Sequence, residues 1–193
     1  MTPSTISLRT EPEDHHVAQL AAAAIALSLA EAAIPSPLPG VKPGLANIVT
    51  LFVLYRYGFR LALWVTALRV VAGSLLLGTF LSPSFILSLS GAAASLAVLL
   101  AAQRLPAKWF GPVTLSLASA FAHLAGQLTV VHWWLIPQTG IVYLVPIFGA
   151  SALLFGTLNG VVVARLLASR HPLLDHLGLA SPIHPDLPPG ESP

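Results

Sequence analysis

A small set of polar side chains that could bind a small molecule stands at or inside otherwise apolar segments. The set is Glu31, Lys42, Asn47, Arg69, His123 and Gln127. His123 and Gln127 are four residues apart, so on a helix they would share one face and could address one ligand together. Ionisable groups within a membrane are costly and usually face a cavity or each other. The set therefore predicts a binding pocket for a small organic solute.

Some members of this set also have purely structural interpretations. Arg69 could form a buried ion pair with Glu31 that only holds helices together, because such pairs are retained in some proteins without touching a ligand. His123 alone would be typical of an interhelical hydrogen bond. The stretch around Lys42 could be an interfacial turn whose charges reach water. The prediction of a pocket therefore rests on the whole set.

The composition is that of an integral membrane protein. Hydrophobic residues make up 55% of the 193 residues, charged residues only 8%, and the mean hydropathy is +0.82. Soluble domains carry roughly 25% charged residues. The absence of cysteine excludes disulfides, a thiolate nucleophile and cysteine-ligated metals. The net charge of +2 comes from single basic residues spread along the chain, which indicates membrane topology rather than nucleic-acid binding.

The apolar runs predict an all-α, polytopic bundle of six transmembrane helices. The predicted spans are 17–34, 44–57, 59–80, 84–102, 112–135 and 141–168. We expect residues 1–16 to be an N-terminal tail without a cleavable signal peptide, because acidic residues interrupt it. Residues 169–193 are rich in proline and lack apolar periodicity, which predicts a disordered tail. The membrane domain would then cover residues 17–168.

The basic residues predict the orientation of the bundle. Seven fall on the side of the termini, and Lys42 alone falls in a loop on the other side; the seven are Arg9, Arg56, Arg60, Arg104, Lys108, Arg165 and Arg170. Cytoplasmic loops are enriched in lysine and arginine, so both termini should be cytoplasmic. In this orientation the polar set lies in the outer half of the bundle. The predicted pocket would open outward.

Small residues recur at helical spacing in two places. Ala18, Ala22, Ala26 and Ala30 form a stripe in the first span, which would serve either internal packing or docking of a partner protein in the membrane. Asn159 lies within the segment 156–160, GTLNG, where the glycines indicate close contact between helices.

Four sequence elements resemble the bacterial Gx transporter family, whose members are also called component I of heptaprenyl diphosphate synthase. They are GVKPGLANIVTL from residue 40, LRVVAGSLLLG from residue 68, SLSG from residue 88 and HLAGQL from residue 123. The resemblance covers about residues 17–168. Two positions depart from the family pattern: Pro43, where leucine is expected, and Leu124, where asparagine is common.

The family is similar to the substrate-capture subunits, or S-components, of energy-coupling-factor vitamin transporters. This resemblance implies six helices in the bacterial inner membrane and an outward-facing site capped by the loop at residues 36–44. It also implies that Ala18, Ala22, Ala26 and Ala30 dock to a membrane coupling subunit that works with ATPases. The expected function is uptake of a vitamin-like or precursor-like solute.

The sequence carries no motif for the synthase chemistry that the second family name suggests. Prenyl-chain elongation needs aspartate clusters that hold magnesium and diphosphate, yet Asp14, Asp175 and Asp186 are isolated. There is no Walker loop either. We therefore expect no enzymatic activity, no metal and no cofactor. Two alternatives to uptake are a non-catalytic membrane subunit that supports isoprenoid synthesis and a scaffold for a flavin or redox assembly. The solute itself, a carboxylate, a phosphate or a flat ring, stays open.

Overall fold

The computed structural model describes residues 12–33, 44–104, 111–135, 143 and 145–168. Every regular element in this part of the chain is helical, which confirms the predicted all-α fold class. The elements are α1 (Pro12–Ala33), α2 (Leu45–Tyr57), α3 (Phe59–Leu76), α4 (Pro83–Ala102), α5 (Pro112–Val130), the π-helical turn η2 (Val131–Leu135) and α6 (Val145–Ala168).

Each predicted span corresponds to one helix, with differences at the ends. The third span was predicted to run to residue 80, but α3 ends at Leu76. Gly78 adopts a φ of 67°, and the Gly78 and Thr79 amides donate to the carbonyls of Leu75 and Ser74 at 3.2 and 2.8 Å. This is a Schellman motif, which ends a helix at a glycine. The predicted N-terminal tail, residues 1–16, overlaps α1, which begins at Pro12. The remainder of both predicted tails lies outside the described residues, so the domain limits stay predictions.

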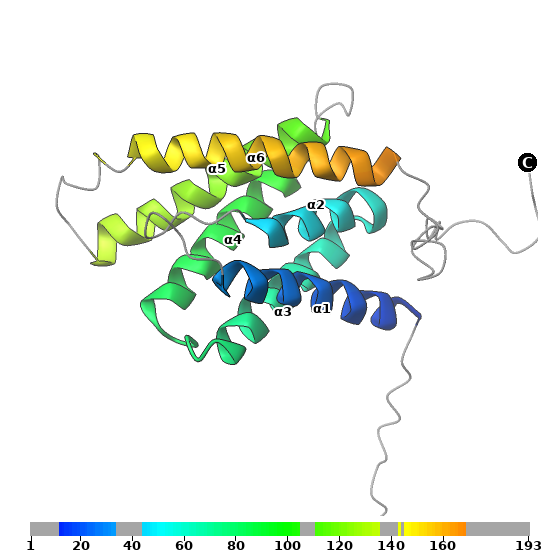
Figure 1. The fold of residues 1–193 in the computed structure, drawn as a ribbon, viewed down its shortest axis with the longest axis horizontal. Coiled ribbons are helices and arrows are strands. Elements are labelled where there is room, and N and C mark those ends of the chain that lie inside the picture. The colour runs from blue at the N-terminus through cyan, green and yellow to red at the C-terminus, as the bar shows by residue number, and fades with distance from the viewer. Residues whose placement is uncertain (1–11, 34–43, 105–110, 136–142, 144, 169–193) are drawn as a thin grey trace, which may run out of the picture.

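Helix α2 lies in the middle of the bundle, between α1 and α6 in Figure 1, and it also contacts α3 and α5. Its buried residues lie all round the helix: Ala46, Val49, Thr50, Leu51, Phe52, Val53 and Leu54. The Thr50 hydroxyl of α2 forms a hydrogen bond with the Thr66 hydroxyl of α3 at 3.1 Å. Its 13 residues span only about 20 Å, which is shorter than a hydrocarbon core of about 30 Å. The helix is therefore held by its neighbours rather than by lipid.

Glycines bring α4, α5 and α6 close together. A Cβ at Gly160 of α6 would lie 2.5 Å from the Val113 Cα of α5, and one at Gly156 would lie 3.2 Å from Ala120 Cβ. A Cβ at Gly126 of α5 would lie 2.6 Å from the Ser90 carbonyl of α4. Small residues permit such close approach in membranes. These contacts agree with the close helix packing predicted for the GTLNG segment.

The outer faces of the longer helices are suited to lipid. Four helical segments, Phe59–Leu76, Pro83–Ala102, Pro112–Trp134 and Val145–Ala168, are long and apolar enough to cross a membrane. Only 17–39% of each apolar window is buried inside the protein, so most of its side chains face outward. The apolar segments Ala18–Ala33 and Leu45–Tyr57 are shorter. The described helices are those of a multi-pass membrane protein, and six complete crossings remain a prediction.

The interior divides into a packed half and a hollow half. The packed half contains the hydrophobic core, formed by Leu20, Ala24, Val49, Leu51, Val53, Leu54, Leu61, Ala62, Val65, Leu99, Leu115 and Val163. It lies around the end of α2 and the start of α3, where Tyr57 and Phe59 pack against it. The hollow half surrounds the other end of α2, and it contains the polar residues singled out in the sequence.

Candidate functional site

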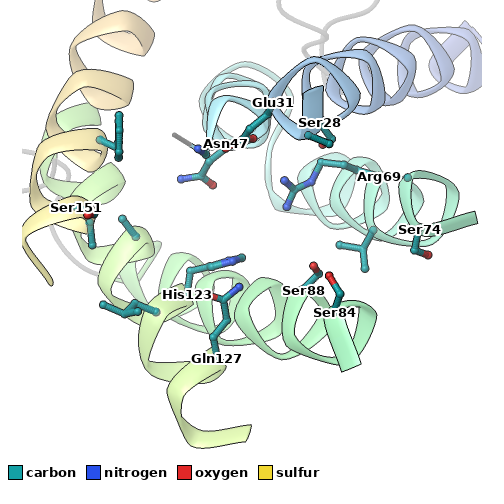
Figure 2. Close-up of a pocket in the computed structure, with 18 of the residues that line it drawn as sticks. Ser28, Glu31, Asn47, Arg69, Ser74, Ser84, Ser88, His123, Gln127 and Ser151 are labelled. Atoms are coloured by element: carbon teal, nitrogen blue, oxygen red, sulfur yellow. Dashed lines mark hydrogen bonds between the residues drawn. The ribbon is translucent and has the colours of Figure 1, made fainter. Parts of the chain in front are cut away.

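The hollow half encloses a cavity of about 270 Å³ that residues from α1 to α6 line. Five of the six predicted binding residues line it: Glu31, Asn47, Arg69, His123 and Gln127. Figure 2 shows them around one space, with Glu31 and Asn47 facing His123 and Gln127 across it. The sixth, Lys42, lies outside the described residues. The fold thus brings together side chains that are almost a hundred residues apart in the sequence.

Glu31 and Asn159 hold the backbone at the start of α2 between them. The Gly44 amide donates to Glu31 Oε1 of α1, and the Asn159 Nδ2 of α6 donates to the Gly44 carbonyl oxygen at 3.1 Å. Gly44 has a φ of 68°, a conformation that L side chains rarely adopt. The side chains of Glu31 and Asn159 are both buried, with 8% and 6% of their surface exposed. We call Glu31, Gly44 and Asn159 the Gly44 clamp, because together they tie α1, α2 and α6.

Asn47 makes a second connection at the same end of α2. Its Nδ2 donates to the Ser119 Oγ of α5 at 3.2 Å, and that hydroxyl donates in turn to the Ser116 carbonyl at 3.0 Å. This bond uses one of the amide's two donor hydrogens. Asn47 therefore both positions α2 against α5 and presents polar atoms to the cavity.

Arg69 enters the cavity from α3, and it has no hydrogen bond to another residue in the part of the chain that the structure describes. Its Nε is buried and has no hydrogen-bond partner, and the guanidinium points into the space between α1 and α5 in Figure 2. The Glu31 carboxylate acts on it through the electric field, but the two side chains form no hydrogen bond among the described residues. The structural ion pair considered from the sequence is therefore not a direct contact.

His123 and Gln127 lie on one face of α5, as their spacing predicted, and both point into the cavity (Figure 2). The His123 ring lies against Gly91 of α4, where an added Cβ would approach Nε2 to 2.6 Å. Gly91 thus provides the space that the imidazole occupies. Gln127 forms no hydrogen bond with another residue in the described part of the chain. We call Arg69, His123 and Gln127 the open set.

Serine and phenylalanine residues complete the wall, and the sequence reasoning missed them. They are Ser28, Ser74, Ser84, Ser88, Ser151, Phe85, Phe148 and Phe155. Ser28 and Ser151 donate to carbonyls of their own helices, at 2.9 Å each, which leaves their oxygens as acceptors. The sequence signal that could have found two of them is spacing: Ser84 and Ser88 are one helical turn apart. Such spacing is common in apolar helices and is weak alone.

The arrangement is suited to binding a small molecule. Donors from Arg69 and Gln127 face the cavity beside hydroxyl oxygens, and the phenylalanines of α4 and α6 supply apolar surface. Small-molecule sites commonly combine a mainly apolar wall with a few placed polar groups. Within the described residues, no three His, Cys, Asp or Glu side chains gather as metal ligands would.

The alanine stripe of α1 lies outside the cavity. Ala18, Ala22, Ala26 and Ala30 are all exposed, whereas Leu20 and the fully buried Ala24 face the core. The stripe is therefore not used for packing within the described bundle. Its exposure leaves it available to lipid or to another protein.

Comparison with known proteins gives one match. The model of the family described as heptaprenyl diphosphate synthase component I matches residues 20–166, which include all six helices in whole or large part. Searches of curated proteins and of solved structures found no match. The matched range contains the cavity, the Gly44 clamp and the open set.

Proposed function

The chain belongs to the heptaprenyl diphosphate synthase component I family, and from this membership and the cavity we propose that it is a non-catalytic membrane protein that captures a small organic solute and passes it inward. The observation that carries the proposal is the open set. Three polar side chains face one cavity inside an apolar bundle, and Arg69 and Gln127 lack hydrogen bonds to other described residues. The Arg69 Nε is buried, and buried polar atoms normally have a partner, which a bound solute would supply.

The capture side in this proposal is the outer face of a bacterial inner membrane. Arg56, Arg60, Arg104 and Arg165 lie at helix ends on the packed side of the bundle, away from the cavity. Positive residues favour the cytoplasm, so the hollow half would face outward. Variants with one introduced cysteine test this orientation, because the natural chain has no cysteine that would also react. A Leu81→Cys variant should react with an impermeant thiol reagent in intact cells, and Arg104→Cys should not; the reverse pattern would overturn the orientation.

Energy for uptake would come from partner subunits. The sequence has no Walker loop, so a separate ATPase would have to drive transport. The exposed alanine stripe of α1 is the surface we assign to a membrane coupling subunit, because small residues allow close approach of another helix. The sequence resemblance to S-components supports the same assignment.

The second candidate is a non-catalytic membrane subunit that supports heptaprenyl diphosphate synthesis. The family name favours it. The cavity does not suit a heptaprenyl chain, because a volume of about 270 Å³ is below the roughly 300–1,000 Å³ of sites for drug-sized molecules. Such a subunit would therefore act through contacts with another protein rather than by enclosing the product.

One experiment separates the two candidates. Cells that lack the gene would express either the natural chain or the double variant His123→Ala, Gln127→Ala at equal levels. The solutes remaining in the medium and the chain lengths of the cellular prenyl products would then be measured by mass spectrometry. Uptake predicts that only the natural chain depletes a particular solute. A change in prenyl products without any depletion would favour the synthesis subunit.

A further inference from the structure

The part-buried side chain of Arg69, whose Nε is fully buried, places a chemical requirement on whatever fills the cavity. Its Nε is shielded from solvent and has no hydrogen-bond partner, and the side chain is aimed into the cavity (Figure 2). A positive group left unpaired inside a protein, and especially inside a membrane, is costly. The charge is therefore expected to be matched by an anion when the site is occupied.

The protein itself does not provide that match among the residues that the structure describes. Glu31 is the single carboxylate in the described wall of the cavity, and its Oε1 accepts the Gly44 amide of the clamp. Its charge acts on Arg69 from a distance, without a hydrogen bond to the guanidinium. The planar donors of Arg69 thus stay available for two oxygens of one acid group, the geometry that arginine favours.

The rest of the wall indicates the form of the molecule. Gln127 and His123 face the cavity from α5 and can bond to a second, uncharged polar group. Phe148 and Phe155 are seven residues apart on α6, so they line one side as an apolar surface. The volume of about 270 Å³ admits a compact molecule.

We propose that the cavity binds a compact molecule with one anionic group, a carboxylate or a monophosphate, whose oxygens pair with Arg69. The proposal rests on the function proposed above and specifies the class of its solute. A phosphate could also belong to the headgroup of a membrane lipid. The experiment therefore has separate arms for soluble acids and for lipid.

The test uses the full chain in nanodiscs of phosphatidylcholine. The probes are benzoate, nicotinate, phenyl phosphate and inorganic phosphate, with benzamide and nicotinamide as neutral analogues of nearly the same shape. Binding is measured as a saturable rise in melting temperature. We expect at least one organic acid to stabilise the natural chain and its amide to have no effect.

Variants then show whether Arg69 carries the effect. Arg69→Gln should weaken binding of the acid at least tenfold, and Arg69→Lys, which keeps the charge but not the planar fork, should weaken it less. Arg60→Gln is the matched control, because Arg60 is exposed at the start of the same helix. It should bind as the natural chain does. The comparison of acid with amide needs no variant, so it stands even if Arg69→Gln does not fold.

Three outcomes would overturn the proposal. Amides that bind as tightly as acids, or full binding by Arg69→Gln, would refute the anion while leaving a solute pocket in place. No response to any probe would refute it as well, and the depletion experiment would still decide the function separately. Stabilisation that depends on Arg69 and appears only in phosphatidylglycerol nanodiscs, without a response to soluble acids, would assign the guanidinium to lipid.

Discussion

The Gly44 clamp and the open set line the same cavity, yet they differ in what they contact. The clamp groups bond to the backbone at the start of α2, across three helices. In the open set, Arg69 and Gln127 have no hydrogen bond to other described residues, and all three side chains face the cavity. Polar groups that are hydrogen-bonded within the protein fix helices relative to one another, whereas polar groups that face a cavity can bind a ligand. Substitutions in the clamp should therefore cost stability, and those in the open set should cost binding.

The largest loss of stability is expected for Glu31→Ala. This change removes the acceptor of the Gly44 amide, a hydrogen bond to a charged group that is worth about 1.5–3 kcal/mol. It also removes the negative charge that acts on Arg69. Thermal unfolding of the protein in detergent should show a clearly lower melting temperature. Glu31→Gln keeps an acceptor oxygen and should lose less; equal melting of the natural chain and Glu31→Ala would contradict the clamp.

Asn159→Ala should follow, with a loss of about 1–3 kcal/mol, because it leaves the Gly44 carbonyl without this donor. The control is Thr157→Ala on the same helix. The Thr157 hydroxyl bonds only to the Leu153 carbonyl one turn earlier, at 2.7 Å, so its removal should cost less than about 1 kcal/mol. Denaturation of both variants under the same conditions gives the comparison. A larger loss for Thr157→Ala would mean that Asn159 does not tie the helices.

Gln127→Ala should show the opposite behaviour. We expect solute binding to weaken tenfold or more, about 1.4 kcal/mol, since an amide that faces the ligand is lost. The melting temperature should change little, because no hydrogen bond within the described protein is broken. Thr129→Ala is the control, being exposed on the same helix and bonded only to the Ala125 carbonyl. Unchanged affinity together with a large loss of stability would place Gln127 with the clamp.

The smallest effect on stability is expected on the outer face of α1. Ala22 is exposed, so Ala22→Leu should fold normally and lose co-purification with a coupling subunit. Ala24 is fully buried two residues away, and Ala24→Leu should cost about 1–3 kcal/mol by overpacking the core. Comparison of Ala22→Leu with Ala24→Leu therefore separates an effect on partner docking from an effect on folding. Normal partner binding by Ala22→Leu would refute the assignment of the alanine stripe as a docking surface.

The sequence predicted the helices well, because apolar runs bounded by proline and glycine leave few alternatives. Pro83 and Pro112 begin α4 and α5, and Gly58 separates α2 from α3. It also predicted five polar residues of the cavity, since charged, imidazole and amide side chains are rare within apolar runs, but it missed the serines. The end of α3 was missed because the Schellman motif depends on the left-handed conformation of Gly78.

The division of those residues into two sets could not be predicted from the sequence. Glu31 was expected to pair with Arg69 or to bind solute, but it bonds to the Gly44 amide. Asn159 was assigned to helix packing, and it also holds the Gly44 carbonyl. Both contacts depend on the relative heights of α1, α2 and α6, which periodicity within one helix does not determine.

The most direct measurement of the central claim is native mass spectrometry of the protein released from its own membrane. The natural chain should carry a bound small molecule, which the double variant His123→Ala, Gln127→Ala should lack; Gln127→Ala alone should carry less of it while keeping the natural melting temperature. Asn159→Ala, with the open set intact, should retain the molecule in its folded fraction. A natural chain without any bound molecule, or a double variant that carries the same one, would contradict the assignment of the hollow half as a solute site.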